Sequence, residues 1–408
     1  MLNSQPKKPY QWISSLYFFQ SMPFVVVTLI AALMYQQYGM DNCHNALLIS
    51  LLALPWVVKP VFAPLLEKVL TRKKLTVLAQ ALVSLLFLML AVTVEHRYFL
   101  FLSIIGFACM ALASSVHDIV SDGVYLLNLD EQKQKRYVPL RTVFYQLGRL
   151  ALKGGLLILA GQLAVYYPVN SWQVFFFCLF LVSALLALYH LAIIPESENK
   201  GQRQENGYFS IVNTLVQNRT SYPALFFIFL YNASEAQMQK MIPLFLLDEG
   251  GLNLELAGVG SIYGLAGSFS LLIGVYISGF LMTQFPVKRC LKILTVVLML
   301  GHALFMLITS SDSRLSLIVT GVVFSQLAAG LANGAFMGYL LSMAGKSSYP
   351  MSAYTLYTSV MALGYVVFGA SSGFIQHYLD YSHFFLYIFI VNVFLVFLTF
   401  RMAGKHDN

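Results

Sequence analysis

Eight ionisable side chains lie inside stretches of the sequence that are otherwise apolar, and they are the residues best placed to carry chemistry. The acids are Asp118, Asp122 and Glu235, and the bases are Lys59, Arg141, Arg149, Lys153 and Lys240. If these stretches span a bilayer, each charge costs at least ~2.5–3.5 kcal/mol near its centre and needs a partner or a water-filled cavity. The bases outnumber the acids, and an excess of buried positive charge favours a cavity that binds an anion.

Two of the acids are one helical turn apart in "SSVHDIVSDGVYLLNL", residues 114–129. Asp118, Asp122 and Tyr125 are spaced i, i+4 and i+7, so a helix places them on one face. Two neighbouring carboxylates repel each other, and this repulsion favours a proton on one of them. Asp118, Asp122 and Glu235 are therefore our candidates for the group that binds a coupling proton.

Charge pairing that only joins helices is the alternative explanation for the same residues. We favour it for Glu67, which has Lys and Arg neighbours in the sequence. Asp118 and Arg141 lie toward the ends of adjacent stretches and equally suit a structural or gating pair. Lys59 lies about two turns from the end of its stretch, where a lysine can reach the interface. Lys59, Glu67 and Arg141 are thus assigned to gating or helix pairing.

The predicted solute-binding residues combine cations with amides and a phenol. They are Gln20, Tyr145, Arg149, Lys153, Gln237, Lys240 and Asn333. We expect the cations to attract an anionic group and the other side chains to hydrogen-bond the polar body of the solute. A semi-polar cavity of this kind suits a glycan or a peptide.

The sequence predicts no metal site, no cofactor other than a proton as coupling ion, and no enzymatic activity. The four cysteines, Cys43, Cys109, Cys178 and Cys290, lack metal-ligand spacing. No nucleophile–histidine pair occurs within the apolar stretches. A membrane enzyme is accordingly disfavoured.

The elements that position these residues are predicted from composition. The chain has 408 residues, of which 58% are hydrophobic and 10% charged, and its mean hydropathy is +0.72. Soluble domains carry roughly 25% charged residues, so the sequence indicates an integral membrane protein in a lipid bilayer.

Hydropathy predicts an all-α membrane protein with twelve transmembrane helices in two pseudo-symmetric six-helix halves. The halves are residues 1–194 and 223–408, joined by a cytoplasmic linker at 195–222. The predicted spans are 11–36, 46–66, 75–94, 98–127, 138–163, 172–194, 223–248, 255–283, 291–309, 315–345, 350–376 and 383–401.

The loop charges predict the orientation of these spans. With the N-terminus in the cytoplasm, eighteen Lys and Arg residues fall inside and only Arg97 and Arg314 fall outside. This distribution places both termini in the cytoplasm. The net charge of +8 then reflects topology, and no nucleic-acid partner is expected.

A repeated loop motif supports the two halves. The sequence "APLLEKVLTRKKL" at 63–75 is matched 216 residues later by "GFLMTQFPVKRCL" at 279–291. Both resemble the cytoplasmic loop motif of the major facilitator superfamily, in which Glu67 stands for the acidic member. In the second copy Thr283 replaces the acid.

Further segments resemble the AmpG-like branch of that superfamily. They are "SLYFFQSMPFVVVTLIAALMY", "LALPWVVKPVFAPLLE", "HDIVSDGVY", "RTVFYQLGR" and "EAQMQKMIPLFLLD". The resemblance implies a monomeric, multi-pass, proton-coupled importer of the bacterial inner membrane. It implies an anionic amphiphilic solute, foremost an anhydromuropeptide of the GlcNAc-anhydroMurNAc type, moved by alternating access. Uptake of a siderophore or another nutrient is the alternative, and a non-transporting membrane sensor is a further one.

Overall fold

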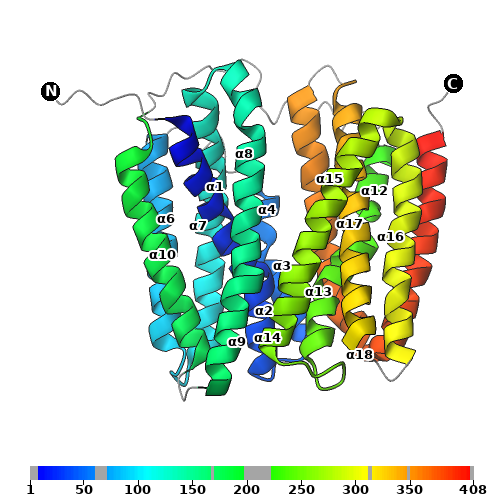
Figure 1. Ribbon diagram of the computed structural model, residues 1–408, viewed down its shortest axis with the longest axis horizontal. Coiled ribbons are helices and arrows are strands. Elements are labelled where there is room, and N and C mark those ends of the chain that lie inside the picture. Colours follow the sequence, from blue (N-terminus) through cyan, green and yellow to red (C-terminus); the bar gives the residue numbers. More distant parts are fainter. Residues whose placement is uncertain are drawn as a thin grey trace. The chain divides into compact units, whose positions relative to one another are not determined.

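The computed structural model describes residues 8–59, 71–166, 170–196, 222–310, 315–346 and 350–404. Its helices form two compact units (Figure 1). Unit 1 contains Met1–Tyr38 and Leu52–Gln202, and unit 2 contains Gly39–Leu51 and Arg203–Asn408. The start of the second predicted span thus packs with the later part of the chain.

Unit 1 contains the first predicted span and the third to the sixth, together with the later part of the second. Three short segments of the described chain are π-helical, one of them in unit 2, and are labelled η. The helices of unit 1 are α1 Pro9–Val25, η1 Val26–Ile30, α2 Ala31–Gln37, α4 Leu54–Val57, α6 Arg72–Thr93, α7 Phe99–Asn128, α8 Glu131–Leu150, η2 Ala151–Leu156, α9 Leu157–Tyr166 and α10 Ser171–Ile193.

Unit 2 contains the seventh to twelfth predicted spans and α3. Its helices are α3 Asn42–Leu52, α12 Tyr222–Tyr231, α13 Ala233–Leu247, α14 Leu256–Val259, η4 Gly260–Gly267, α15 Ser268–Gln284, α16 Val287–Ser310, α17 Leu315–Ala344 and α18 Pro350–Gly404. The helical backbone of α18 is interrupted at Asp380, where φ is 55° and ψ is 179°. Because α18 thus comprises two spans, each predicted span coincides with helical structure over its described residues.

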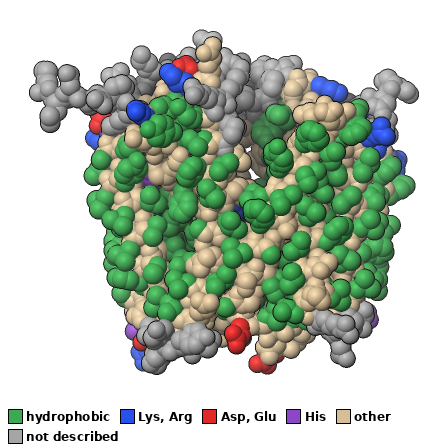
Figure 2. Space-filling model, in the orientation of Figure 1, with side chains coloured by type: hydrophobic (Ala, Val, Ile, Leu, Met, Phe, Trp, Pro, Cys, Tyr) green, Lys and Arg blue, Asp and Glu red, His purple; other side chains and the backbone are tan. Residues whose placement is uncertain are grey.

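Lipid is the natural neighbour of the outward faces of these helices. Nine helical segments in the described part of the chain are long and apolar enough to cross a membrane, and Ala353–Met402 covers two spans. On α6 the side chains of Leu78, Leu85 and Val92 are about 60% exposed or more, and Figure 2 shows hydrophobic side chains across the visible face. Exposed apolar surface of this extent marks a membrane-embedded protein.

In unit 1, α1 packs closely against α8. The contact is tight at Gly148, where a Cβ atom would collide with Ser21 Oγ and lie 2.8 Å from the Phe18 carbonyl oxygen. Trp12, Leu16 and other side chains of α1 fill the buried cluster beside α7. The small residue on α8 therefore sets the distance between two helices that carry predicted site residues.

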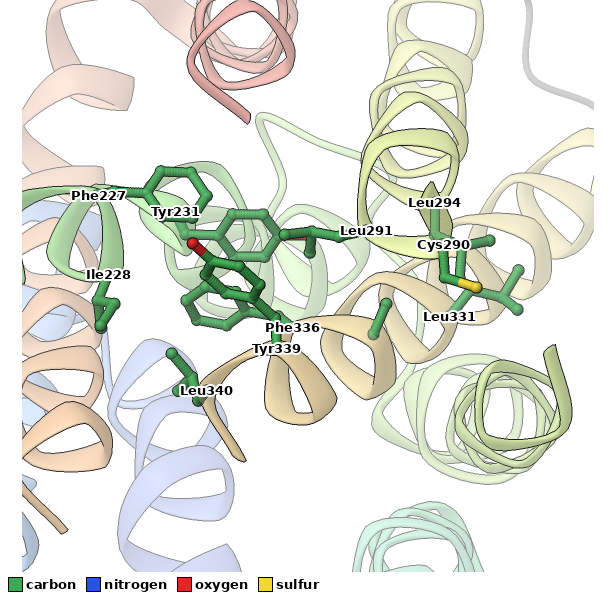
Figure 3. Close-up of a cluster of buried hydrophobic side chains, with 11 residues drawn as sticks. Phe227, Ile228, Tyr231, Cys290, Leu291, Leu294, Leu331, Phe336, Tyr339 and Leu340 are labelled. Atoms are coloured by element: carbon green, nitrogen blue, oxygen red, sulfur yellow. The ribbon is translucent and has the colours of Figure 1, made fainter. Parts of the chain in front are cut away.

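In unit 2, an aromatic cluster joins α12, α16 and α17 (Figure 3). Tyr231 stacks on Phe336 with ring centroids 3.9 Å apart and an interplanar angle of 13°. Phe227 packs edge-on against the same Phe336 ring, and the Tyr231 hydroxyl hydrogen-bonds Thr295 Oγ1 at 2.9 Å. Such pairs each contribute about 0.5–1.5 kcal/mol beyond area burial, so this cluster holds α12 in a fixed position next to α13.

Acidic caps begin two of the spans outside the apolar segments. Asp130 Oδ1 accepts a hydrogen bond from the Lys133 backbone N–H at 2.8 Å, and Asp380 Oδ1 accepts from the His383 backbone N–H at 3.0 Å. The Lys133 side chain and backbone hold the pKa of Asp130 below its ordinary value. The backbone N–H of His383 does the same for the pKa of Asp380. Both caps satisfy helix-start donors that would otherwise lack partners.

Candidate functional site

Asp122 of α7 is held by two donors in unit 1. Arg141 of α8 donates from a terminal guanidinium nitrogen to Asp122 Oδ1 at 2.9 Å, and the Tyr17 hydroxyl of α1 donates to the same oxygen at 2.8 Å. The Arg141 guanidinium also stacks over the rings of Tyr17 and Tyr125, at 4.4 and 4.9 Å from their centroids. These contacts link α1, α7 and α8, as expected if Arg141 joins helices or belongs to a gate.

Asp118, one turn earlier on α7, has a different cation. Lys59, which follows α4, donates from Nζ to Asp118 Oδ2. The sequence-based pairing of Asp118 with Arg141 is therefore wrong. Arg141 reaches Asp122 because Asp122 is one turn closer to the end of α7, where α8 begins. The two acids on one face of α7 each hold a separate base.

Three predicted solute-binding residues gather near Asp118. Gln20 of α1 faces the Asp118 carboxyl and is 9% exposed. Tyr145 of α8 is within electrostatic range of both Asp118 and Arg149. The Arg149 guanidinium makes a long 3.4 Å contact to Gln146 Oε1, and its buried Nε–H has no acceptor among the residues described. This part of unit 1 thus offers an incompletely satisfied cation beside an amide and a phenol.

Lys153 lies one turn beyond Arg149, in the π-helical segment η2. Its side chain is half-buried, like that of Arg149. A π-helical segment widens the helix locally, and such segments are frequent at functional sites. The structure therefore keeps Lys153 in the same span as Tyr145 and Arg149, within an irregular turn.

His117 points away from its neighbour Asp118. It contacts Gln80 of α6, with 2.9 Å between His117 Nε2 and Gln80 Nε2, and Gln80 Oε1 contacts His190 Nδ1 of α10 at 3.0 Å. His190 Nε2 continues to Ser15 Oγ at 2.9 Å. These four side chains, all buried except half-buried Ser15, join four helices of unit 1, and hydropathy alone gives no sign that they meet.

Glu235 of α13 meets a histidine rather than a lysine or arginine. Its Oε2 lies 3.1 Å from His302 Nε2 of α16, and its Oε1 accepts from Gln239 Nε2 at 2.8 Å. Asn392 of α18 lies 3.1 Å from His302 Nδ1. Glu235 and His302 are each 1% exposed. The sequence predicts Glu235 as a proton candidate, but not its partners, because they come from helices far away in the chain.

Lys240 lies farther along α13 and is half-buried. It makes no hydrogen bond or ion pair with any residue in the described ranges. A Cβ built on Gly369 of α18 would lie 3.4 Å from its Cε, so the lysine stem packs against the backbone of α18. The ammonium group is therefore held in place by packing and left without a carboxylate.

The remaining predicted residues fall in three different settings. Gln237 is fully buried, donating to the Ala233 carbonyl at 3.0 Å and the Tyr387 hydroxyl at 3.4 Å. Asn333 of α17 is half-buried and has no hydrogen bond to the described part of the chain. Glu67 lies outside the described residues.

A shallow pocket of about 530 Å³ in unit 1 lies apart from the predicted solute-binding residues. It is lined by α1 and α10 with Phe144, mostly through apolar atoms. Its lining contains none of the predicted solute-binding residues. An apolar groove of this kind suits a lipid chain rather than the polar solute.

A profile of the Major Facilitator Superfamily matches residues 13–369. The AmpG 1 protein of Rickettsia bellii is 20% identical over 377 residues, covering 88% of this chain and 89% of that protein. The anhydromuropeptide permease of Escherichia coli K12 is 22% identical over 278 residues, covering 68% of this chain and 55% of that protein.

Two solved structures share the fold over nearly the whole chain. The nucleoside transporter NupG superposes with a TM-score of 0.71 at 19% identity, covering 98% of this chain and 99% of that one. The D-xylose–proton symporter superposes with a TM-score of 0.73 at 9% identity, covering 96% of each chain. The common fold is the twelve-helix arrangement that the sequence predicts.

Proposed function

The chain belongs to the Major Facilitator Superfamily, and from this premise we propose that it is a proton-coupled importer in the bacterial inner membrane. Its solute is an anionic amphiphile, an anhydromuropeptide of the GlcNAc-anhydroMurNAc type. Transport proceeds by alternating access of the halves 1–194 and 223–408, joined by the linker 195–222. Both termini lie in the cytoplasm, and the protein acts as a monomer.

The proposal of an anionic solute rests on the positive charge that remains in the spans once the paired acids and bases are set aside. Lys59 and Arg141 neutralise the two acids of α7. Lys240 has no acidic partner in the described structure. A cation without a carboxylate partner in a membrane span is costly. A negatively charged solute removes that cost, and differential stabilisation of this kind is what binding requires.

The names of the relatives support the choice of solute. One relative over 68% of this chain is an anhydromuropeptide permease. An anhydromuropeptide presents sugar hydroxyls, amides and peptide carboxylates in one molecule. Amide and phenol side chains such as Gln20 and Tyr145 match the first two groups, and Arg149 and Lys240 match the carboxylates.

Thermal stabilisation of the purified protein tests this assignment. We expect GlcNAc-anhydroMurNAc-peptide to raise the Tm, since a ligand at 100 times its Kd adds about 2.7 kcal/mol to stability. Lys240→Met should abolish most of that rise. Lys346→Met, at an exposed lysine, is the matched control and should keep it.

The same measurement distinguishes the alternatives. Stabilisation by a metal–siderophore complex, and not by the muropeptide, would assign the protein to siderophore uptake. Binding without any solute-dependent pH change in proteoliposomes would assign it to a sensor. Either result contradicts the proposed muropeptide–proton symport.

A further inference from the structure

Four polar side chains from α13, α16 and α18 form a buried chain in unit 2. They are Ser234, Glu235, His302 and Asn392, and each is at most 1% exposed. Ser234 Oγ donates to Asn392 Oδ1 at 2.8 Å, Asn392 Nδ2 contacts His302 Nδ1 at 3.1 Å, and His302 Nε2 contacts Glu235 Oε2 at 3.1 Å. Burying these groups together is costly unless each hydrogen bond is made.

The orientation of the Asn392 amide fixes the histidine tautomer. Asn392 Nδ2 donates to the Ile388 carbonyl at 2.8 Å, while Oδ1 accepts from Ser234. The second Nδ2 hydrogen then points to His302 Nδ1, which must accept it. His302 is therefore neutral, with its one hydrogen on Nε2, and donates that hydrogen to Glu235.

The ionised form of Glu235 is thus supported by donors that carry no charge of their own. His302 donates to one oxygen and Gln239 donates to the other. The other titratable group that faces Glu235 is Tyr231 of α12, and its hydroxyl is bonded to Thr295. Lys240 on the same helix forms no ion pair with Glu235. Among the described residues, no cation competes with a proton for this carboxylate.

The two acids of unit 1 differ in this respect. Asp118 is paired with Lys59, and Asp122 with Arg141 and Tyr17. A proton that binds to either must displace a full positive charge from its carboxylate. Protonating Glu235 instead removes a buried charge without creating another.

Resting on the proposed transport function, we propose that Glu235 is the site of the coupling proton and that His302 and Asn392 are positioning residues for it. The proton forms an O–H bond with the Glu235 carboxylate when taken from water on one side of the membrane, and the same bond breaks to return it to water on the other. An added proton cannot stay on His302 Nδ1, because that nitrogen faces the Asn392 donor. Half-buried Gln239 can turn its amide to accept from the protonated acid.

Infrared titration of the purified protein in detergent tests the site without any solute. Acidification should produce the C=O stretch of a protonated buried carboxyl in the wild type and in the exposed control Glu249→Gln. Glu235→Gln should lose this band. A band that persists unchanged in Glu235→Gln overturns the proposal.

Asn392→Asp tests the positioning role and serves if Glu235→Gln fails to fold. An acceptor facing His302 Nδ1, with an added negative charge, favours the imidazolium. The imidazolium stabilises the ionised Glu235 carboxylate, so the midpoint of the Glu235 C=O band should move down by about one to three pH units. An unmoved midpoint contradicts the role of Asn392.

Proteoliposomes separate this proposal from the transport function, with labelled GlcNAc-anhydroMurNAc as probe. Glu235→Gln should retain exchange of internal for external probe but lose accumulation driven by a pH gradient, its concentration ratio falling to 1. The exposed control Glu249→Gln should still accumulate the probe. Uphill uptake by Glu235→Gln would contradict the proton site but not the transport function. Absence of exchange in the wild type would contradict the muropeptide assignment, and the infrared titration would then decide whether Glu235 is the proton site.

Discussion

At the scale of single residues, removing one partner of the Lys59–Asp118 pair should destabilise the protein more than removing both. The side chains are 29% and 10% exposed. Asp118→Asn leaves a lysine with no counter-charge, and breaking one side of such a pair costs roughly 3 kcal/mol or more. We expect a clear drop in Tm, measured by thermal unfolding in detergent. Removing both charges in Lys59→Met/Asp118→Leu should recover most of the loss, and a double variant as unstable as the single one contradicts this account.

Asp122 provides a milder case on the same helix. Its side chain is 46% exposed, so solvent screens its pairing with Arg141. We predict that Asp122→Asn lowers the Tm by less than Asp118→Asn does, in the same unfolding assay. An equal or larger loss would mean that the stack of Arg141 on Tyr17 and Tyr125 depends on the charge of Asp122.

The stability that Asp380 gives to the start of the last span should depend on pH. The His383 backbone N–H lowers the pKa of Asp380. The contribution of the ionised Asp380 to folding stability is therefore complete above the unfolded pKa of about 3.9. It is lost as the pH falls through the pKa of the folded state. Asp380→Ala should cost about 1 kcal/mol at neutral pH through loss of the cap. The difference from the wild type should shrink below about pH 4. Asp380→Asn, which keeps the acceptor, should lose less.

At the scale of elements, the contact between α1 and α8 depends on one missing side chain. Gly148→Ala introduces a Cβ that collides with Ser21 Oγ and approaches the Phe18 carbonyl. The Phe18 carbonyl belongs to the backbone of α1, which cannot move aside as easily as the tip of a side chain. We expect a loss of about 1–3 kcal/mol from this overpacking, visible as a lower Tm. Gly155→Ala on the same span is the matched control, since nothing lies within 4 Å of its added Cβ. Equal losses would exclude the packing explanation.

A second element-scale contact anchors α3 within unit 2. Asn42 Nδ2 lies 3.1 Å from Asp248 Oδ2 and 2.7 Å from the Tyr381 hydroxyl, which itself donates to Asp248. Asn42→Leu removes the hydrogen bonds to Asp248 and Tyr381, each worth about 0.5–1.5 kcal/mol net. Native-state hydrogen exchange should then be faster across α3. Unchanged exchange there would show that apolar packing alone holds the segment.

The helices were predictable from the sequence, but the partners of their polar residues were not. Eighteen or more apolar residues must form a helix in lipid, so the spans and the break near Asp380 follow from hydropathy. Arg141 was matched to the wrong aspartate, because choosing between two acids one turn apart requires the end of α7 and the start of α8 in space. His302 gave no signal as a partner of Glu235, since 67 residues separate them.

At the scale of the whole molecule, the loop charges predict the orientation of the protein in the membrane. The excess of Lys and Arg in alternate loops predicts cytoplasmic termini, and this orientation puts the loop containing His96 and Arg97 outside the cell. In a variant without native cysteines, His96→Cys should react with a membrane-impermeant thiol reagent in intact cells. Lys133→Cys, equally exposed, should react only after permeabilisation. The reverse pattern would invert the predicted topology, although symport with protons would still carry the solute down the proton gradient into the cell.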